Sequence, residues 1–407
     1  MMCWALLAFM ISFNLFLPEL NDFLTILGGK DLKGFIFFMF AISAGISRPF
    51  SGKLSDTIGR KKVMFIGVAI GLVAILSYPF SGAALIFLSL RFLHGFSAGF
   101  LPTGATALVT DQLPEKGRGV AMGIWGTFIS VGFGVGNFFA GPIKDIIGLT
   151  GLFIVAAIFC LIAGIMISFV KETLPNPQKF HPKLLAVKWD DIFEPTVRPA
   201  AFIMFCSATS TGIMFVTSPD MSGYLGIDNK GWFFLFYMTS TILIRLFASK
   251  MSDNIGRERA LIIGLSFMAL SMTLLGTATE WIQYTAGATV FGISTGISSP
   301  TIFAWTADLS PEDRRGVGAG TVFIALEAAI MFGALVTLGI YDNSISTIPY
   351  CYLIGTAIAI IGVLYLFWYL KKYGSKRNLV LNSQESSEIL DRNIDRDRIE
   401  QGEEDLK

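Results

Sequence analysis

The chain has little of what soluble enzymes and metal proteins are built from. Only 15% of its 407 residues are charged, whereas about one quarter is usual in a soluble domain. Its four cysteines form no CxxC pair and no zinc-binding spacing, so we interpret them as small buried hydrophobic residues. The nucleotide-binding pattern GxxxxGKS/T is absent, and no paired catalytic set stands out. We therefore expect no cofactor, no metal site and no enzymatic activity.

Hydrophobic residues dominate instead, at 53% of the chain, and the mean hydropathy is +0.64. The 42 glycines fit this composition, because glycine is commoner in membrane helices than in soluble ones. An apolar run of about 18 residues or more is long enough to cross a bilayer as a helix. Twelve such runs begin near residues 3, 33, 62, 83, 118, 150, 199, 231, 260, 281, 316 and 347. The sequence thus predicts an all-α integral membrane protein with twelve transmembrane helices.

Lysine and arginine predict how these helices are oriented. Loops after the even-numbered helices hold most of the loop cations, whereas the loops after odd-numbered helices hold Lys30, Lys33, Lys144 and Lys230. Cytoplasmic loops carry the excess of positive charge. We therefore expect a multi-pass protein of the cell membrane with both termini in the cytoplasm. A net charge of +1 gives no sign of a nucleic-acid partner.

Prolines and charges indicate how the chain is divided. The loop between the sixth and seventh predicted helices, residues 171–198, is rich in proline and is interpreted as a cytoplasmic linker. It separates an N-terminal six-helix half, residues 1–170, from a C-terminal six-helix half, residues 199–371. Residues 372–407 are strongly charged and lack apolar periodicity, which predicts a disordered cytoplasmic tail.

The two halves are related in sequence. Asp253 follows Asp56 by 197 residues, and the same offset aligns RPFSGKLSDTIGRKKVMFIG with RLFASKMSDNIGRERALIIG. It also aligns GFSAGF and TDQLPEKGRGVAMG with GISTGI and ADLSPEDRRGVGAG. Near the start of each half the offset becomes 201, which pairs Glu19 with Asp220. One offset over this length, without gaps, indicates a duplicated unit of six helices.

The repeated string carries a family resemblance. Its first copy, Gly52-x-Leu54-x-Asp56-x-x-Gly59-Arg60-Lys61, resembles the signature between helices two and three of the major facilitator superfamily. Arg91, in RFLHGFSAG, resembles the helix-four signature of the same superfamily. The resemblance covers residues 3 to about 371 and leaves out the tail. It implies the major facilitator fold, with two pseudo-symmetric halves that alternate access to a site between them.

A third motif resembles the helix-five signature of the drug:proton antiporters in this superfamily. It comprises Gly123, Gly132, Gly136, Asn137 and Gly141. Two positions depart from the pattern, because Asn137 replaces a proline and Ala140 replaces a glycine. In the family this motif is associated with outward transport, so the departure leaves the direction of transport open.

Charged residues of the repeated string are candidates for a gating role. Asp56 lies at the foot of the second helix, where a carboxylate can accept N–H bonds from a neighbouring helix N-terminus. Arg60 can pair with Asp111 at the cytoplasmic end of helix four. With the second copy, the gating motif comprises Gly52, Asp56, Gly59, Arg60, Asp111, Asp253, Gly256, Arg257 and Asp308. The resemblance implies that these contacts hold the halves together while the carrier is open to the outside. For Lys61 and Lys62 we prefer a simple role in orientation.

Ionisable residues within apolar helices are costly in lipid and usually face a cavity or a partner. The candidates for transport and proton coupling are Glu19, Asp22, Arg91, His94, Asp220 and Glu327. A carboxylate in a low-dielectric cavity can load and release a proton near neutral pH, so we favour Glu327 and Glu19 as proton sites. The alternatives are that Glu19 and Asp22 are wet interfacial residues and that Glu327 is a neutral structural acid. Arg91 is expected to face a cavity or pair with a helix-one acid, and His94 to titrate or to be a satisfied polar residue.

Three functions fit these observations. The first is a proton-coupled exporter, or antiporter, of small apolar or amphiphilic compounds, similar to the twelve-helix drug:proton antiporters and working by rocker-switch alternating access. The second is an inward-directed or facilitative carrier for a sugar or another small metabolite. The third is a non-transporting membrane receptor. The expected partners are a small-molecule substrate, protons and membrane lipid. We expect a monomer, because the duplicated halves already supply a complete pathway.

Overall fold

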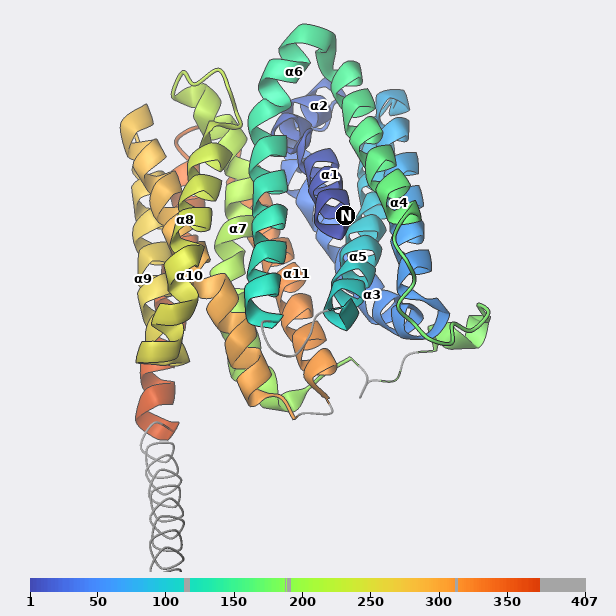
Figure 1. Ribbon diagram of the computed structural model, residues 1–407. Helices are drawn as coiled ribbons and strands as arrows, with labels where there is room; N and C mark the ends of the chain where they lie inside the picture. Colours follow the sequence, from blue (N-terminus) through green and yellow to red (C-terminus); the bar gives the residue numbers. More distant parts are fainter. Residues whose placement is uncertain (113–117, 187, 189–191, 312–313, 374–407) are drawn as a thin grey trace, which may run out of the picture. The chain divides into compact units, whose positions relative to one another are not determined.

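All regular secondary structure in the described part of the chain is helical. The computed structural model (Figure 1) describes residues 1–112, 118–186, 188, 192–311 and 314–373, with all side chains except those of residues 118–123, 246–250 and 315. Every regular element in these ranges is a helix, which confirms the all-α prediction. The chain divides into two units, Met1–Gly362 and Val363–Lys407. Of the tail predicted to be disordered, residues 374–407 lie outside the described residues.

The first half begins with an interrupted helix. α1 (Met2–Asn14) is followed by the 3-10 helix η1 (Leu17–Glu19) and by α2 (Leu20–Ile26). Pro18 explains the interruption, because proline has no N–H group and its ring clashes with the preceding turn. The other helices of this half are η2 (Lys30–Leu32), α3 (Lys33–Ile58), α4 (Arg60–Ser77), η3 (Tyr78–Phe80), α5 (Ala84–Gln112) and α6 (Arg118–Ser168).

α6 consists of two helices joined at a bend. Its 51 residues exceed what one crossing requires, which is about 20 residues. Gly148, in its interior, has a φ of 73°, a left-handed conformation that glycine adopts without steric cost. Gly148 therefore separates the fifth predicted helix from the sixth.

The second half is preceded by a linker with two short 3-10 helices, η4 (Pro182–Leu185) and η6 (Pro195–Val197). Its helices are α7 (Arg198–Tyr224), α8 (Trp232–Ile255), α9 (Arg257–Gly276), α10 (Trp281–Leu309) and α11 (Arg315–Ile340). A last helix, Ile348–Tyr373, contains the boundary between the two units.

The helices account for the predicted membrane crossings. Among the described residues, nine helices are long and apolar enough to cross a membrane. α6 is one of these nine although it bends at Gly148. α8 contains a shorter apolar stretch, Trp232–Arg245, and α10 is 29 residues long. With α6 counted as two and with α8 and α10 added, the described residues contain the twelve predicted helices.

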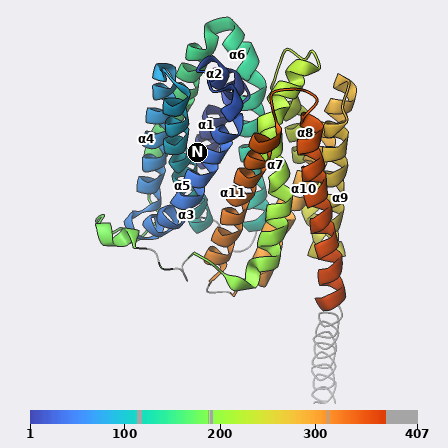
Figure 2. The ribbon, with the colours of Figure 1, turned by 180° about the vertical axis from the view of Figure 1, so that it is seen from behind.

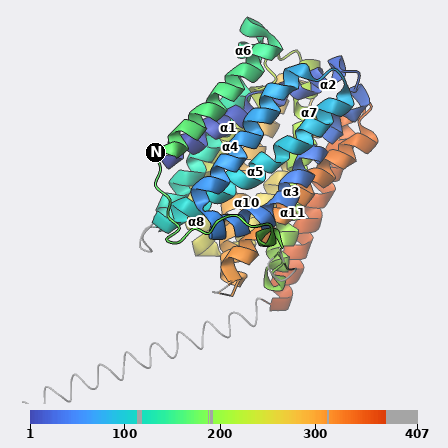
Figure 3. The ribbon, with the colours of Figure 1, turned by 90° about the vertical axis from the view of Figure 1, so that its right-hand side faces the viewer.

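Close packing of equivalent helices follows the repeat. α5 packs against α3 and α4 (Figure 3), and α10 packs against α8 and α9. A Cβ atom added at Gly95 of α5 would lie 1.9 Å from Ser43 Oγ of α3. A Cβ atom added at Gly292 of α10 would lie 1.9 Å from Ser240 Oγ of α8. Both residue pairs are related by the offset of 197, so the same small-residue contact is built in each half.

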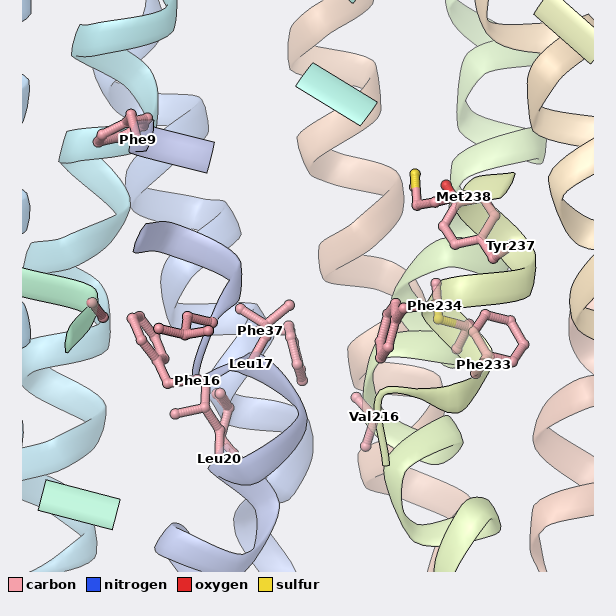
Figure 4. Packing of buried hydrophobic residues seen from close by; sticks show 14 of the residues in the cluster. Phe9, Phe16, Leu17, Leu20, Phe37, Val216, Phe233, Phe234, Tyr237 and Met238 are labelled. Carbon is pink, nitrogen blue, oxygen red and sulfur yellow. The ribbon is translucent and has the colours of Figure 1, made fainter. Parts of the chain in front are cut away.

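The two halves meet along two pairs of helices. α3 packs against α11 (Figure 2), and α6 packs against α8. Buried apolar residues continue across this boundary, and Figure 4 shows Phe16 and Phe37 of the first half opposite Phe234 of the second. The Phe37 ring stacks on that of Phe215, with centroids 5.3 Å apart. We call the end of the bundle that carries Gly59, Gly256 and the linker the hinge end. The opposite end, with α2 and the bend of α6, is called the far end.

Candidate functional site

An ion pair joins the halves near the middle of their helices. Arg48 lies near the centre of α3 and Glu327 near the centre of α11, and Arg48 Nη2 is 2.8 Å from Glu327 Oε1. The two side chains are only 15% and 10% exposed. The guanidinium also lies over the Phe323 ring, 4.6 Å from its centroid. The buried acid predicted in helix eleven thus has a cationic partner from the other half, and Arg48 is not among the residues singled out above.

A related contact joins α8 to α6. Arg245 Nη1 donates to the Gly126 carbonyl at 3.1 Å and to Ser130 Oγ at 2.8 Å. Arg48 and Arg245 are equivalent in the repeat, since they are the first residues of the aligned strings RPFSG and RLFAS. Glu327 and Ser130 are likewise 197 residues apart. The duplication therefore places an arginine across the boundary between the halves twice.

Two lysine–carboxylate contacts join the halves at the far end. Lys33, at the start of α3, lies 2.5 Å from Asp220 of α7. Lys230, just before α8, pairs with Asp22 of α2 and lies 3.9 Å from Glu19. Lys33 and Lys230 are again 197 residues apart, and Glu19 is the counterpart of Asp220. The far-end contact is therefore also made twice, once from each half.

The two acids at the centre of these contacts have further partners. Asp220 accepts hydrogen bonds from Asn21 Nδ2 at 3.1 Å and from the Tyr341 hydroxyl at 2.6 Å. Glu19 is fully buried, and its Oε2 accepts a bond from Lys144 Nζ at 2.7 Å. Glu19 Oε1 has no hydrogen-bond partner among the described residues. The helix-one acid predicted as a proton site thus lies beside two lysines that are predicted to be in loops on the outer side.

Backbones also approach closely at the far end. A Cβ atom added at Gly34 would lie 2.5 Å from the Ala334 carbonyl oxygen, and one added at Gly231 would lie 2.1 Å from that of Asn137. These two contacts are related by the offset of 197 as well. At such distances no side chain larger than hydrogen fits. In this structure the far end is closed by contacts between the two halves.

Arg91 and His94 lie inside the first half. Arg91 Nε donates to the Ile36 carbonyl at 3.3 Å, and its guanidinium lies over the Phe40 ring at 4.6 Å. Tyr78 links the two residues, because its hydroxyl is 3.4 Å from Arg91 Nη1 and 2.7 Å from His94 Nδ1. Within the described residues no carboxylate lies within 4 Å of Arg91. The acid of helix one, Glu19, pairs with Lys144 instead.

The gating motif forms ion pairs within each half. Arg60 Nε lies 3.0 Å from Asp111, and its Nη2 lies 3.3 Å from Asp56. In the second half, Arg257 Nε lies 3.0 Å from Asp308 and also pairs with Asp253. Gly59 and Gly256 have φ values of 117° and 92°, a region that favours glycine, and they separate α3 from α4 and α8 from α9. A Cβ atom added at Gly52 would meet no atom within 4 Å. In this conformation the arginine–aspartate pairs of the gating motif therefore form within each half.

The carboxylate at the start of α4 is that of Glu172, not of Asp56. Glu172 Oε1 accepts the N–H of Arg60 at 3.1 Å, and Oε2 accepts that of Lys61 at 3.0 Å. Burial alone raises the pKa of Glu172, but backbone N–H donors, from Leu174, Lys61, Arg60 and Thr173, outweigh it and bring this pKa below its ordinary value. The sequence offered one signal for this role, since Glu172 directly follows the sixth helix in a polar stretch.

The helix-five motif packs α6 against α1 and against the second half. A Cβ atom added at Gly132 would lie 2.5 Å from Met10 Cβ, and one added at Gly136 would lie 2.9 Å from Asn14 Cβ. Asn137 Nδ2 donates to the Phe133 carbonyl at 2.8 Å and to Asn14 Oδ1 at 3.3 Å. An added Cβ atom at Gly141 would lie 3.3 Å from Asn229 Oδ1. Gly123 belongs to the part of α6 whose side chains are not described.

Comparisons with known proteins agree with this architecture. The model of the Major Facilitator Superfamily matches the chain twice, over residues 2–199 and 200–394. An uncharacterized MFS-type transporter of Methanocaldococcus jannaschii is 26% identical over 337 residues, which are 80% of this chain and 86% of the relative. The multi-drug resistance efflux pump PmrA of Streptococcus pneumoniae is 26% identical over 319 residues, which are 73% of this chain and 75% of the pump.

A solved structure has the same fold. The human organic anion transporter MFSD10 (TETRAN) superposes with a TM-score of 0.71, over 90% of this chain and 97% of that protein. The sequences are 18% identical, so the likeness concerns the fold alone.

Proposed function

Because this chain belongs to the major facilitator superfamily, we propose that it exports small apolar or amphiphilic compounds across the cell membrane in exchange for protons. Members of the superfamily are multi-pass membrane transporters, and multidrug efflux pumps such as PmrA are among its relatives. The names of these relatives support outward transport of drug-like compounds. We also propose that both termini are cytoplasmic, that the halves are residues 1–170 and 199–371, and that one copy of the chain is functional.

The ion pair between Arg48 and Glu327 carries the proposal of proton coupling. It joins the halves near mid-helix at 2.8 Å, in a position where an unpaired charge is costly. When Glu327 is ionised, Arg48 compensates its charge. A proton on Glu327 removes that charge, which breaks the ion pair and weakens the contact between α3 and α11. Protonation of one acid is thereby linked to relative movement of the two halves.

The distribution of contacts supports alternating access. At the far end, two lysine–carboxylate contacts and two close backbone contacts join the halves. At the hinge end, Arg60 and Arg257 pair with acids of their own half. We infer that this structure is the state closed to the outside. In the opposite state, the hinge-end pairs of the gating motif would be the groups that hold the halves together on the cytoplasmic side.

An inward carrier for a small metabolite is the second candidate. The departure of the helix-five motif at Asn137 favours it, because this residue contacts Asn14 of α1 through its side chain in a place where the antiporter signature has a proline. Proline has no N–H group, so it could not make this contact with Asn14. The direction of flux separates the two candidates.

Transport in inverted membrane vesicles with an imposed pH gradient tests the proposal. A mixed library of fluorescent amphiphilic compounds is screened for uptake and for proton release on addition of compound. We expect proton release that is lost in Glu327→Gln and kept in Glu280→Gln, since Glu280 is an exposed acid in the loop before α10. A transport rate that does not depend on the pH gradient would exclude proton coupling. Accumulation only in right-side-out vesicles would favour the inward carrier.

A further inference from the structure

The two arginines that cross between the halves differ in the charge that they meet. Arg48 contacts the carboxylate of Glu327. Arg245 instead donates hydrogen bonds to the Ser130 hydroxyl and to the Gly126 carbonyl. Ser130 is the counterpart of Glu327 at the offset of 197. Both halves therefore have an arginine contact at the equivalent position, but only one of the two contacts includes an acid.

Among the described residues, no carboxylate compensates the charge of the Arg245 guanidinium. No carboxylate of the described residues lies within 4 Å of it. Arginine stays protonated in proteins, and an unpaired cation in a membrane interior is costly. The Ser130 hydroxyl cannot offset this cost, since it carries no charge and also lies 3.1 Å from the Gly126 carbonyl, to which it donates its own proton.

One edge of this guanidinium has no hydrogen-bond partner among the described residues. Nη1 makes both of the hydrogen bonds that Arg245 forms with described residues. Nε is buried and has no hydrogen-bond partner among them. Nε and Nη2 together present two parallel N–H groups, the fork that binds a carboxylate or another planar oxyanion through two hydrogen bonds. The position of this edge, on a helix at the boundary between the halves, is where substrates of this fold bind.

We propose that Arg245 binds an anionic group of the transported compound, so that amphiphilic anions and zwitterions belong to the substrate class. This inference rests on the proposed transport function, and the anion takes the place that Glu327 holds in the equivalent pair. Lipid headgroups and inorganic anions carry the same chemistry. The experiment must therefore distinguish a transported anion from a lipid headgroup or an inorganic anion bound at the same place.

Binding to the purified full-length protein tests this assignment without any proton gradient. Dansylglycine and its amide, dansylglycinamide, share one apolar ring system and differ in a single carboxylate. Their affinities are measured by fluorescence in phosphatidylcholine nanodiscs. We expect the wild type to bind dansylglycine at least tenfold more tightly than the amide. Absence of this preference overturns the proposal.

Two substitutions then locate the anion. Arg245→Gln removes the cation, and Ser130→Glu supplies the acid that the first pair has, so each should weaken dansylglycine binding at least tenfold and leave the amide within twofold. Ser130→Gln matches Ser130→Glu in size but carries no charge, so it should weaken dansylglycine binding by less than Ser130→Glu does. Size-exclusion profiles verify that each variant is folded. Equal losses for both probes, or no loss in Arg245→Gln, would contradict the assignment.

The source of the anion is decided by competition. Adding phosphatidylglycerol to the nanodiscs, or inorganic phosphate and chloride to the buffer, should leave dansylglycine binding unchanged if the site is for cargo. Displacement by either would assign the site to lipid or to a small ion and overturn the cargo proposal. Because these measurements need no gradient, a failure of proton coupling leaves their result intact, and the reverse also holds.

Discussion

Glu172 follows α6 and accepts the backbone N–H groups of Arg60 and Lys61 at the start of α4. The first N–H groups of a helix have no partner within the helix, so a carboxylate there satisfies them and complements the helix dipole. The repeat does not duplicate this residue, because the position 197 residues later is Tyr369. Single residues can thus differ between halves whose helices correspond closely.

Replacing Glu172 with glutamine should destabilise the protein in a pH-dependent way. The pKa of this carboxyl is lowered in the folded state, so its contribution is present above the unfolded value of about 4.3 and is lost as pH falls through the folded pKa. At pH 7 we expect a loss of about 1 kcal/mol, the usual size of a helix-capping contact. Thermal denaturation in detergent at pH 7 and pH 4 measures it. A difference that stays constant over this range would contradict the capping role.

At the scale of elements, the helices of the two halves meet where glycines allow it. Gly34 of α3 faces α11, and Gly231 at the start of α8 faces α6. Both lie at the far end, beside the lysines that pair with acids of the other half. The close backbone contacts and the lysine–carboxylate pairs therefore lie at the same end of the bundle. Each of them requires the two halves to be close together there.

Gly231→Leu should prevent the far end from closing. Its Cβ atom would lie 2.1 Å from the Asn137 carbonyl oxygen, a distance that real Cβ atoms do not reach, so α8 and α6 must separate. We expect turnover in proteoliposomes to fall at least tenfold at equal reconstitution. Gly223→Leu is the matched control, because an added Cβ atom there meets nothing within 4 Å. Similar turnover in the two variants would show that this close contact is dispensable.

At the scale of the whole first unit, contacts across the halves are arranged in equivalent pairs. Arg48 and Arg245 cross near mid-helix, and Lys33 and Lys230 cross at the far end. A duplicated chain makes such pairs naturally, because each contact between halves recurs with the halves exchanged. The pairs differ in their surroundings, since the Asp220 side chain is 8% exposed and the Asp22 side chain is 51% exposed.

Removing both far-end lysines should open the far end more than removing either one. In a variant whose four native cysteines are replaced, Val216→Cys reports on this end, because Val216 is buried and lines a small recess with Lys33 and Tyr341. We expect a membrane-impermeant maleimide, added outside, to label it at least tenfold faster in Lys33→Gln/Lys230→Gln. Each loss leaves an acid without its cation.

The control for this experiment is Lys30→Gln, an exposed lysine at the same end. Labelling of the double variant at the rate of this control would mean that the lysine–carboxylate contacts do not keep the far end closed. Intermediate rates in the two single variants are expected, because the two contacts are equivalent but separate.

Much of the fold was predictable because hydrophobicity and duplication are properties of the sequence itself. Apolar runs predicted the twelve helices, with the bend at Gly148 separating two of them. The partners of the buried charges were not predictable in the same way. Arg48 and Arg245 stand at the first position of the aligned strings, and KGF at Lys33 recurs as KGW at Lys230. Lys33 and Lys230 are predicted only as loop cations, and no role is predicted for Arg48 or Arg245, although their recurrence was a signal that they share a role.

The sequence by itself determined that this protein is a duplicated bundle of membrane helices, because long apolar runs have no stable alternative to helix in a bilayer. It also indicated Glu19 and Glu327 as candidate buried acids, since both lie within such runs. Only the tertiary structure decided what those acids meet: Lys144 beside Glu19, and Arg48 beside Glu327. Such pairs join residues more than a hundred positions apart, and their geometry depends on how helices of the two halves pack.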